Sequence, residues 1–137
     1  MEEEIMKISP SPPMEKRMLN SSLLAYNLPI LIEKMKLSNI WLKGELDSII
    51  LLESPDKQVL LTTMHEGTEI NFSRSNESVT FQVIEGKIKF ITREESVDLN
   101  KGQLLTLHGK RKYSLTCMED TAFLLTISNG ILWPAEN

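Results

Sequence analysis

The chain has 137 residues, of which 41% are apolar and 25% are charged, and its formal net charge is −4. This length suits one domain with a substantial hydrophobic core. A negative net charge gives no general field for holding a phosphate backbone or an anionic membrane surface, so neither nucleic acid nor a membrane is an expected partner.

Cysteine usage and hydropathy predict a cytoplasmic protein. The single cysteine, Cys117, excludes an internal disulfide, and no N-terminal apolar run resembles a signal peptide. Apolar runs such as Ile49 to Leu52 are far too short to span a bilayer.

The N-terminal part divides into a tail and a helical segment. Residues 1–20 combine glutamates with three prolines and show no sustained periodicity, which predicts a flexible arm. Residues 21–137 are expected to form a single domain, with a barrel core at about 46–128. A helix is predicted from Asn27, which can cap it, with Pro29 in the first turn. Its apolar residues recur at helical spacing and are expected to pack on the domain itself, with docking on a partner as the alternative; they are Leu28, Leu31, Ile32 and Met35.

After Gly44 the sequence consists of short runs rich in Ile, Leu, Val, Thr and Phe, separated by turn residues. Many short strands of this kind close into a sandwich or jelly-roll barrel. The predicted strands are Leu46–Leu52, Gln58–Met64, Glu69–Arg74, Val79–Ile84, Lys87–Thr92, Glu95–Leu99, Leu104–Leu107, Tyr113–Cys117 and Ala122–Ser128.

The segment EGTEINFSRSNESVTFQVIEGKIKF resembles the first cupin motif, in which a glycine is followed by His-x-His, a glutamate and a second glycine. Gly67 and Gly86 occupy the two glycine positions with the spacing kept. Ser73 and Ser75 fall on the two histidine positions, and Val79 falls on the glutamate position.

The segment KGQLLTLHGKRKYSLTC is similar in spacing to the second cupin motif and begins with its glycine at Gly102. The proline of the family falls on His108, its second glycine on Lys110 and its metal-binding histidine on Tyr113. The resemblance covers about Leu46 to Ser128. It implies an all-β, cupin-like double-stranded β-helix, a jelly-roll barrel, with a short N-terminal helix.

The ligand positions hold residues that do not suit the family's metal. Cupin metals are held by imidazole nitrogens and a carboxylate, whereas serine and tyrosine hydroxyls must lose a proton and valine has no lone pair to donate. We therefore expect neither a metal nor another cofactor at Ser73, Ser75, Val79 and Tyr113.

Strand alternation then predicts the contents of the barrel. If Ser73 and Ser75 point inward, Glu69 and Asn71 share their face and Ile70 and Phe72 face the other layer. On the next strand the inward residues are expected to be Val79, Phe81 and Val83. With Tyr113, this set forms a mixed lumen for a small molecule; a packed or water-filled barrel is the alternative.

The two histidines suggest two other sites. His65 and His108, with Glu66 or Glu69, could form a metal site, although lone histidines are more often structural. His108 and Tyr113 could form an acid/base pair like that of the metal-free sugar epimerases of the cupin group.

Two further features have simple interpretations. The run Lys110 to Lys112 could attract an anionic ligand, but a solvated turn is the preferred interpretation. Cys117 is expected to be a buried, inert thiol.

Three functions remain open. The favoured hypothesis is a metal-free barrel that binds a small molecule or acts as an accessory or regulatory protein. The alternatives are a metal-independent isomerase or epimerase using Tyr113 and His108, and a structural protein that forms a homodimer; a homodimer is expected in any case.

Overall fold

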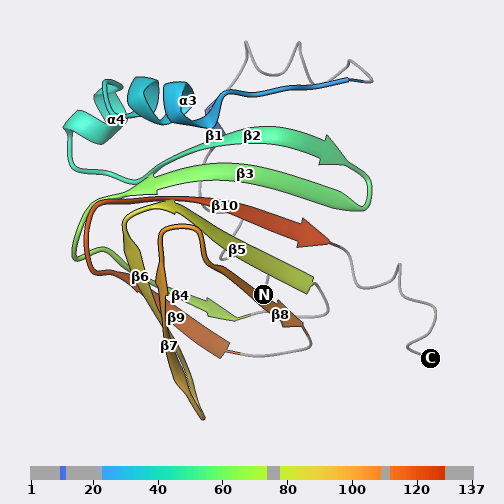
Figure 1. Cartoon of the computed structure of the whole chain (residues 1–137), viewed down its shortest axis with the longest axis vertical. Coiled ribbons are helices and arrows are strands. Elements are labelled where there is room, and N and C mark those ends of the chain that lie inside the picture. Colours follow the sequence, from blue (N-terminus) through green and yellow to red (C-terminus); the bar gives the residue numbers. More distant parts are fainter. Residues whose placement is uncertain (1–9, 12–22, 74–77, 109–111, 129–137) are drawn as a thin grey trace.

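The computed structural model describes residues 10–11, 23–73, 78–108 and 112–128 (Figure 1), and at Pro10, Ser11, Ser73 and His108 it describes the backbone alone. The elements in chain order are β1 (Pro10–Ser11), α3 (Leu28–Met35), α4 (Asn39–Leu42), β2 (Asp47–Ser54), β3 (Lys57–Met64), β4 (Glu69–Ser73), β5 (Ser78–Glu85), β6 (Lys87–Thr92), β7 (Ser96–Asn100), β8 (Leu104–His108), β9 (Lys112–Cys117) and β10 (Thr121–Ser128). No helix among these is long and apolar enough to cross a membrane.

The strands form two sheets that pack face to face. The larger sheet has the order β1-β2-β3-β10-β5-β8, and the smaller sheet has the order β4-β9-β6-β7. Neighbouring strands are antiparallel except for β1, which pairs with β2 in parallel. Figure 1 shows the helices over the larger sheet and the smaller sheet on its other side. The predicted jelly-roll fold with an N-terminal helix is confirmed.

The strand boundaries agree with the sequence prediction to within two residues at every end, and β6 agrees at both ends. This agreement follows from the turn residues. Gly67, Gly86 and Gly102 all have φ between 85° and 92°, a region that favours glycine, so each of these glycines interrupts a strand pattern at a fixed position.

Local capping determines where the helices begin. The Asn27 side chain accepts a hydrogen bond from the Ile30 N–H at 3.2 Å, which caps α3 as predicted. The Ser38 hydroxyl accepts from the Trp41 N–H at 3.2 Å and caps α4, a second short helix that the sequence analysis did not separate from the first.

The part of the larger sheet that α3 covers is buried on both faces. The inner faces of the two sheets enclose the main core. On the outer face of the larger sheet, Ile32 and Met35 of α3 pack against Ile49 and Leu61. The predicted packing of the helix on its own domain is confirmed. Burial on both sides explains why β3 is continuously buried from Leu60 to Met64 rather than in alternation.

The predicted N-terminal arm contributes a short edge strand. Pro10 is opposite Ser48 and Ser11 is opposite Ile49 in the β1–β2 pairing. An edge position tolerates proline, which has no N–H to donate to the ladder. The other residues of the 1–20 segment lie outside the described residues.

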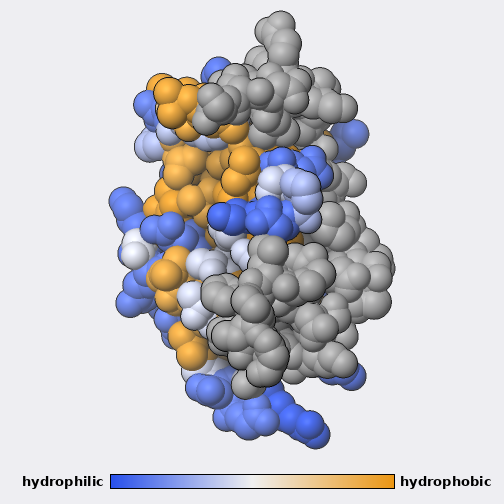
Figure 2. All heavy atoms as spheres, turned by 90° about the vertical axis from the view of Figure 1, so that its right-hand side faces the viewer, coloured by the Kyte–Doolittle hydropathy of each residue, from blue (hydrophilic) through white to orange (hydrophobic). Residues whose placement is uncertain are grey.

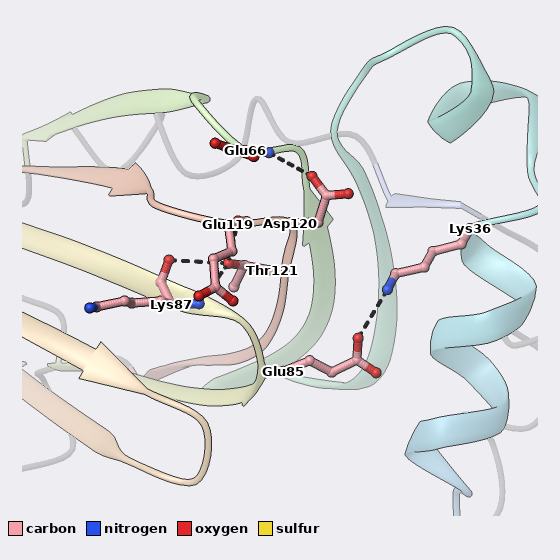
Figure 3. A network of polar contacts seen from close by, with 7 residues as sticks. All are labelled: Lys36, Glu66, Glu85, Lys87, Glu119, Asp120 and Thr121. Carbon is pink, nitrogen blue, oxygen red and sulfur yellow. Dashed lines mark hydrogen bonds and ion pairs between the residues drawn. The ribbon is translucent and has the colours of Figure 1, made fainter.

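One end of the barrel is closed by polar contacts (Figure 3). Around Thr121, the hydroxyl donates to the Glu119 carbonyl at 2.8 Å and accepts from the Lys87 N–H at 3.2 Å. Asp120 accepts from the Glu66 N–H at 2.8 Å, and the Lys36 ammonium pairs with Glu85 at 2.9 Å. These contacts join both sheets and the end of α3.

Candidate functional site

The barrel interior contains the apolar residues that strand alternation predicted. Val79, Phe81 and Val83 of β5 are fully buried, whereas the residues between them are partly exposed. Tyr113 of β9 lies in the same core and is 3% exposed. Whether these residues bind a ligand remains a prediction.

Aromatic rings fill the space between the sheets. The Tyr113 ring stacks on Phe72, with ring centroids 4.8 Å apart, and on Phe90, with centroids 5.4 Å apart. Phe81 contacts Phe90 edge-on at 4.7 Å and Phe123 at 5.6 Å. Five rings from both sheets thus form one packed cluster where the sequence analysis placed a mixed lumen.

The predicted orientation of β4 is wrong. Phe72 is buried in the main core and Ile70 packs against it, whereas Glu69 and Asn71 are exposed. Reading the motif by spacing alone assigned the opposite face, and a one-residue difference in register moves a whole strand face from core to solvent. Burial of a phenylalanine and an isoleucine outweighs burial of a carboxylate and an amide.

The two serines of the first motif are not placed in the interior by the structure. Ser73 pairs with Lys112 through the backbone, and its side chain is outside the described residues, as is all of Ser75. Phe72, the residue before Ser73, is buried in the main core.

The described interior does not fit the metal that the cupin motif implies. Val79 and Tyr113, which fall on two of the family's ligand positions, belong to the buried core together with Phe72, and none of the three offers an imidazole or a carboxylate. Among the residues that the structure describes, no group of three or more His, Cys, Asp or Glu is arranged to hold a metal ion. The absence of a metal and of other cofactors stays a prediction.

The alternative metal site of His65 and His108 is wrong because the two residues lie at opposite ends of the larger sheet. His108 is opposite Ser78, the first residue of β5, while His65 follows Met64, whose partner Thr121 lies beyond the last residue of β5. The length of β5 separates them by roughly 23 Å at about 3.3 Å per residue. His65 instead stacks on Trp41 at 3.5 Å, with its Nε2 3.0 Å from the Trp41 carbonyl oxygen.

Of the predicted acid/base pair, the structure describes the side chain of Tyr113 alone. This residue is buried between two phenylalanine rings. His108 ends β8, and its side chain is outside the described residues. Of the basic run, Lys112 is exposed at the start of β9, and the other two residues are not described.

Cys117 is the buried thiol that the sequence predicted. It is 1% exposed in the main core. Burial raises the pKa of this thiol from 9.0 to about 11, with the neighbouring Asp120 adding to the rise and a hydrogen bond with Thr121 opposing it. A protonated, enclosed thiol is a poor nucleophile.

A cavity of about 310 Å³, which we call the mouth cavity, lies between the edges of the two sheets. Its walls are Phe90 and Thr92 of β6, Glu95 of the β6–β7 turn, Val97 of β7, and Leu105 to Leu107 of β8. The cavity is near the barrel end at which β8 ends and β9 begins, since Thr92 is opposite Tyr113 and Leu107 precedes His108. The sequence analysis missed this site because it forms between β7 and β8, edge strands of different sheets.

A tight turn holds the polar side of the mouth cavity. The Thr92 N–H donates to the Glu95 carbonyl at 2.8 Å, and the Thr92 hydroxyl accepts from the Glu95 N–H at 3.1 Å. The turn holds the backbone of Glu95 beside the cavity, and Phe90 belongs both to the cavity wall and to the aromatic cluster.

Figure 2 views the molecule from the side on which β8 and β10 end in Figure 1. The described surface there carries a connected hydrophobic area in its upper part and smaller hydrophobic areas below it, set among hydrophilic residues. Exposed apolar residues near the mouth cavity include Ile91, Val97 and Leu104.

Comparison with known proteins shows the fold. No protein-family model and no curated protein matches this chain. Among solved structures, a cupin-2 domain containing protein from Shewanella frigidimarina is similar with a TM-score of 0.60 and 16% identity, over 77% of this chain and 95% of that one. An uncharacterized Klebsiella pneumoniae protein with a double-stranded β-helix domain has a TM-score of 0.57 and 22% identity, over 68% of this chain and 81% of that one. The cupin domain of Schizosaccharomyces pombe Cnp3 has a TM-score of 0.59 and 17% identity, over 66% of this chain and 69% of that one. The chain therefore has the fold of a small cupin domain.

Proposed function

We propose that this cupin-fold chain is a metal-independent binding protein that holds a small molecule in the mouth cavity. The observation that carries the proposal is the cavity itself, which combines apolar walls with a few polar groups between the two sheets. Ligand sites in proteins commonly have this composition, and about 310 Å³ is at the small end of their usual volume range.

The packed interior supports placing the ligand at the mouth rather than in the centre. Phe72, Phe81, Phe90 and Tyr113 pack against one another in the barrel interior. Any ligand there would have to displace closely packed rings, at a cost of several kcal/mol. A ligand in the mouth cavity rests on Phe90 and leaves the cluster intact.

Enzymatic use of Tyr113 with His108 receives less support. A general acid must come within hydrogen-bonding distance of its substrate, and Tyr113 is enclosed between Phe72 and Phe90. The buried, protonated Cys117 fits a reducing cytoplasmic setting, which we propose as the location.

The first test combines elemental analysis with native mass spectrometry of freshly purified protein. Stoichiometric transition metal that survives a mild chelator would overturn the metal-independent part of the proposal. Extra mass released on denaturation would supply the ligand for identification.

A second test locates binding with a neutral probe. Phenylpropanol is titrated into the protein while backbone amide NMR shifts are followed, and changes are expected on β6, β7 and β8. Thr106→Trp, which fills the cavity from β8, should weaken binding, whereas Leu104→Trp on the same strand, outside the cavity walls, should not. Absence of binding, or equal effects of the two substitutions, would refute the proposed site.

The helical segment favours a homodimer as a second role. Large apolar side chains are exposed on and around α3 and α4; they are Leu23, Ile30, Leu37, Ile40 and Leu42. Leu37 and Leu42 are 76% and 69% exposed, and apolar groups gathered in this way commonly form an interface. Sedimentation equilibrium should show a dimer that Leu37→Glu with Leu42→Glu converts to a folded monomer. A monomeric parent protein would exclude this role.

A further inference from the structure

We infer that the mouth cavity selects a small amphiphilic cation, a protonated amine on an aromatic or aliphatic body. This inference rests on the proposed function and adds the chemical class of the ligand. It derives from the charge and the contacts of the cavity walls.

Of the cavity-wall residues that the structure describes, Glu95 alone is charged. Within the described part of the chain, its carboxylate makes no hydrogen bond and no ion pair, while its backbone N–H and carbonyl are both held by Thr92. The nearby Asp98 differs, because it pairs with the Lys89 ammonium at 3.7 Å. The Glu95 backbone is therefore held in place, and its exposed carboxylate is available to a ligand at the cavity wall.

The other walls determine the rest of the ligand. Val97, Leu105 and Leu107 provide apolar contact, and Phe90 provides the end of an aromatic cluster. Thr106 of β8 adds a hydroxyl group to the cavity walls, and β8 belongs to the other sheet than the β6–β7 turn that carries Glu95. An ammonium at the rim with an apolar body toward Phe90 satisfies both sides, whereas a carboxylate in the same position would face Glu95 in a protein of net charge −4.

The experiment compares three probes of nearly equal size and shape: phenylpropylamine, phenylpropanol and phenylpropanoate. Affinities are measured by amide NMR titration at neutral pH and low salt. We expect the amine to bind about fivefold more tightly than the alcohol, the size of a partly solvated ion pair, and the carboxylate to bind most weakly.

Glu95→Gln should reduce amine binding to the level of the alcohol and leave the alcohol unchanged. Glu94→Gln is the matched control: it removes the same charge from the adjacent residue, which is not part of the cavity wall. Its effect on amine binding should stay below about twofold, as expected for a screened charge outside the contact.

The outcomes separate this inference from the proposed function. Equal binding of amine and alcohol, tighter binding of the carboxylate, or equal effects of the two substitutions would overturn the inference and leave a binding cavity in place. Failure of all three probes to shift resonances of β6, β7 and β8 would overturn both.

Discussion

Truncation of Phe81 to alanine tests whether the barrel interior is a core or a lumen. Phe81 is 0% exposed and contacts Phe72, Phe90, Tyr113 and Phe123. Removing a buried phenylalanine side chain typically costs about 3–5 kcal/mol, and a site that packs against four rings cannot collapse easily, so we expect a loss of about 4–5 kcal/mol in the free energy of unfolding.

This loss is large compared with the roughly 5–15 kcal/mol that stabilises a typical domain. Urea unfolding followed by circular dichroism measures it. With a slope of about 2 kcal/mol per molar urea, the midpoint should fall by about 2 M. Leu104→Ala is the control: Leu104 is 55% exposed on β8, and its truncation should change stability by less than about 0.5 kcal/mol.

The result that would refute the reasoning is a small effect. If Phe81→Ala costs less than about 1.5 kcal/mol with an unchanged slope, the side chain lines a space that water or a ligand already occupies. The interior would then be a lumen, and the argument for placing a ligand at the mouth would fail.

Three further predictions concern the closed end of the barrel. Gly86→Ala should destabilise the protein by at least about 3 kcal/mol, because Gly86 has φ +92° and an added Cβ would meet the Asp120 carbonyl oxygen and lie 2.7 Å from the Thr121 Cα. The control Gly67→Ala should cost only about 1 kcal/mol in the same urea assay, because Gly67 has φ +86° but open space around it. Equal costs of the two substitutions would contradict the packing argument. The Cys117 thiol has a pKa of about 11 in the folded protein against 9.0 as its ordinary value, so its contribution to stability is present below pH 9 and is lost as the pH rises to 11. The free energy of unfolding, measured across this range, should fall by up to roughly 2–3 kcal/mol in the parent protein but not in Cys117→Ala. The same pH dependence of stability in both proteins would refute the prediction. Glu85→Gln should lower the free energy of unfolding, measured in urea, by less than about 1 kcal/mol, because the Lys36–Glu85 pair is partly exposed. A larger loss would contradict this expectation and would show that the pair holds α3 in place.

The sequence was sufficient for the fold because each strand carries its own boundary signals. In β5, apolar Val79, Phe81 and Val83 alternate with polar residues, and the structure buries the apolar set. In β4 the same alternation favours Ile70 and Phe72 as the inner face. The error there arose because motif spacing was given more weight than local alternation.

The mouth cavity could not be predicted because no single segment contains it. The cavity depends on the distance between the β6–β7 hairpin and β8, and the hairpin and β8 belong to different sheets. That separation follows from the packing of the rings between the sheets, which involves residues from Phe72 to Phe123. Strand patterns specify which residues point inward, but they do not specify the distance between two sheet edges.

The position of α3 has a consequence for where this domain can be cut. Ile49, Leu61 and Ala122 belong to the strands of the barrel, yet they are covered by Ile32 and Met35 of the helix. A fragment limited to the barrel strands would expose this apolar sheet face to water and would be prone to association. The smallest piece suited to expression, crystallisation or fusion therefore starts ahead of Tyr26, whose hydroxyl donates to the Leu51 carbonyl at 2.8 Å.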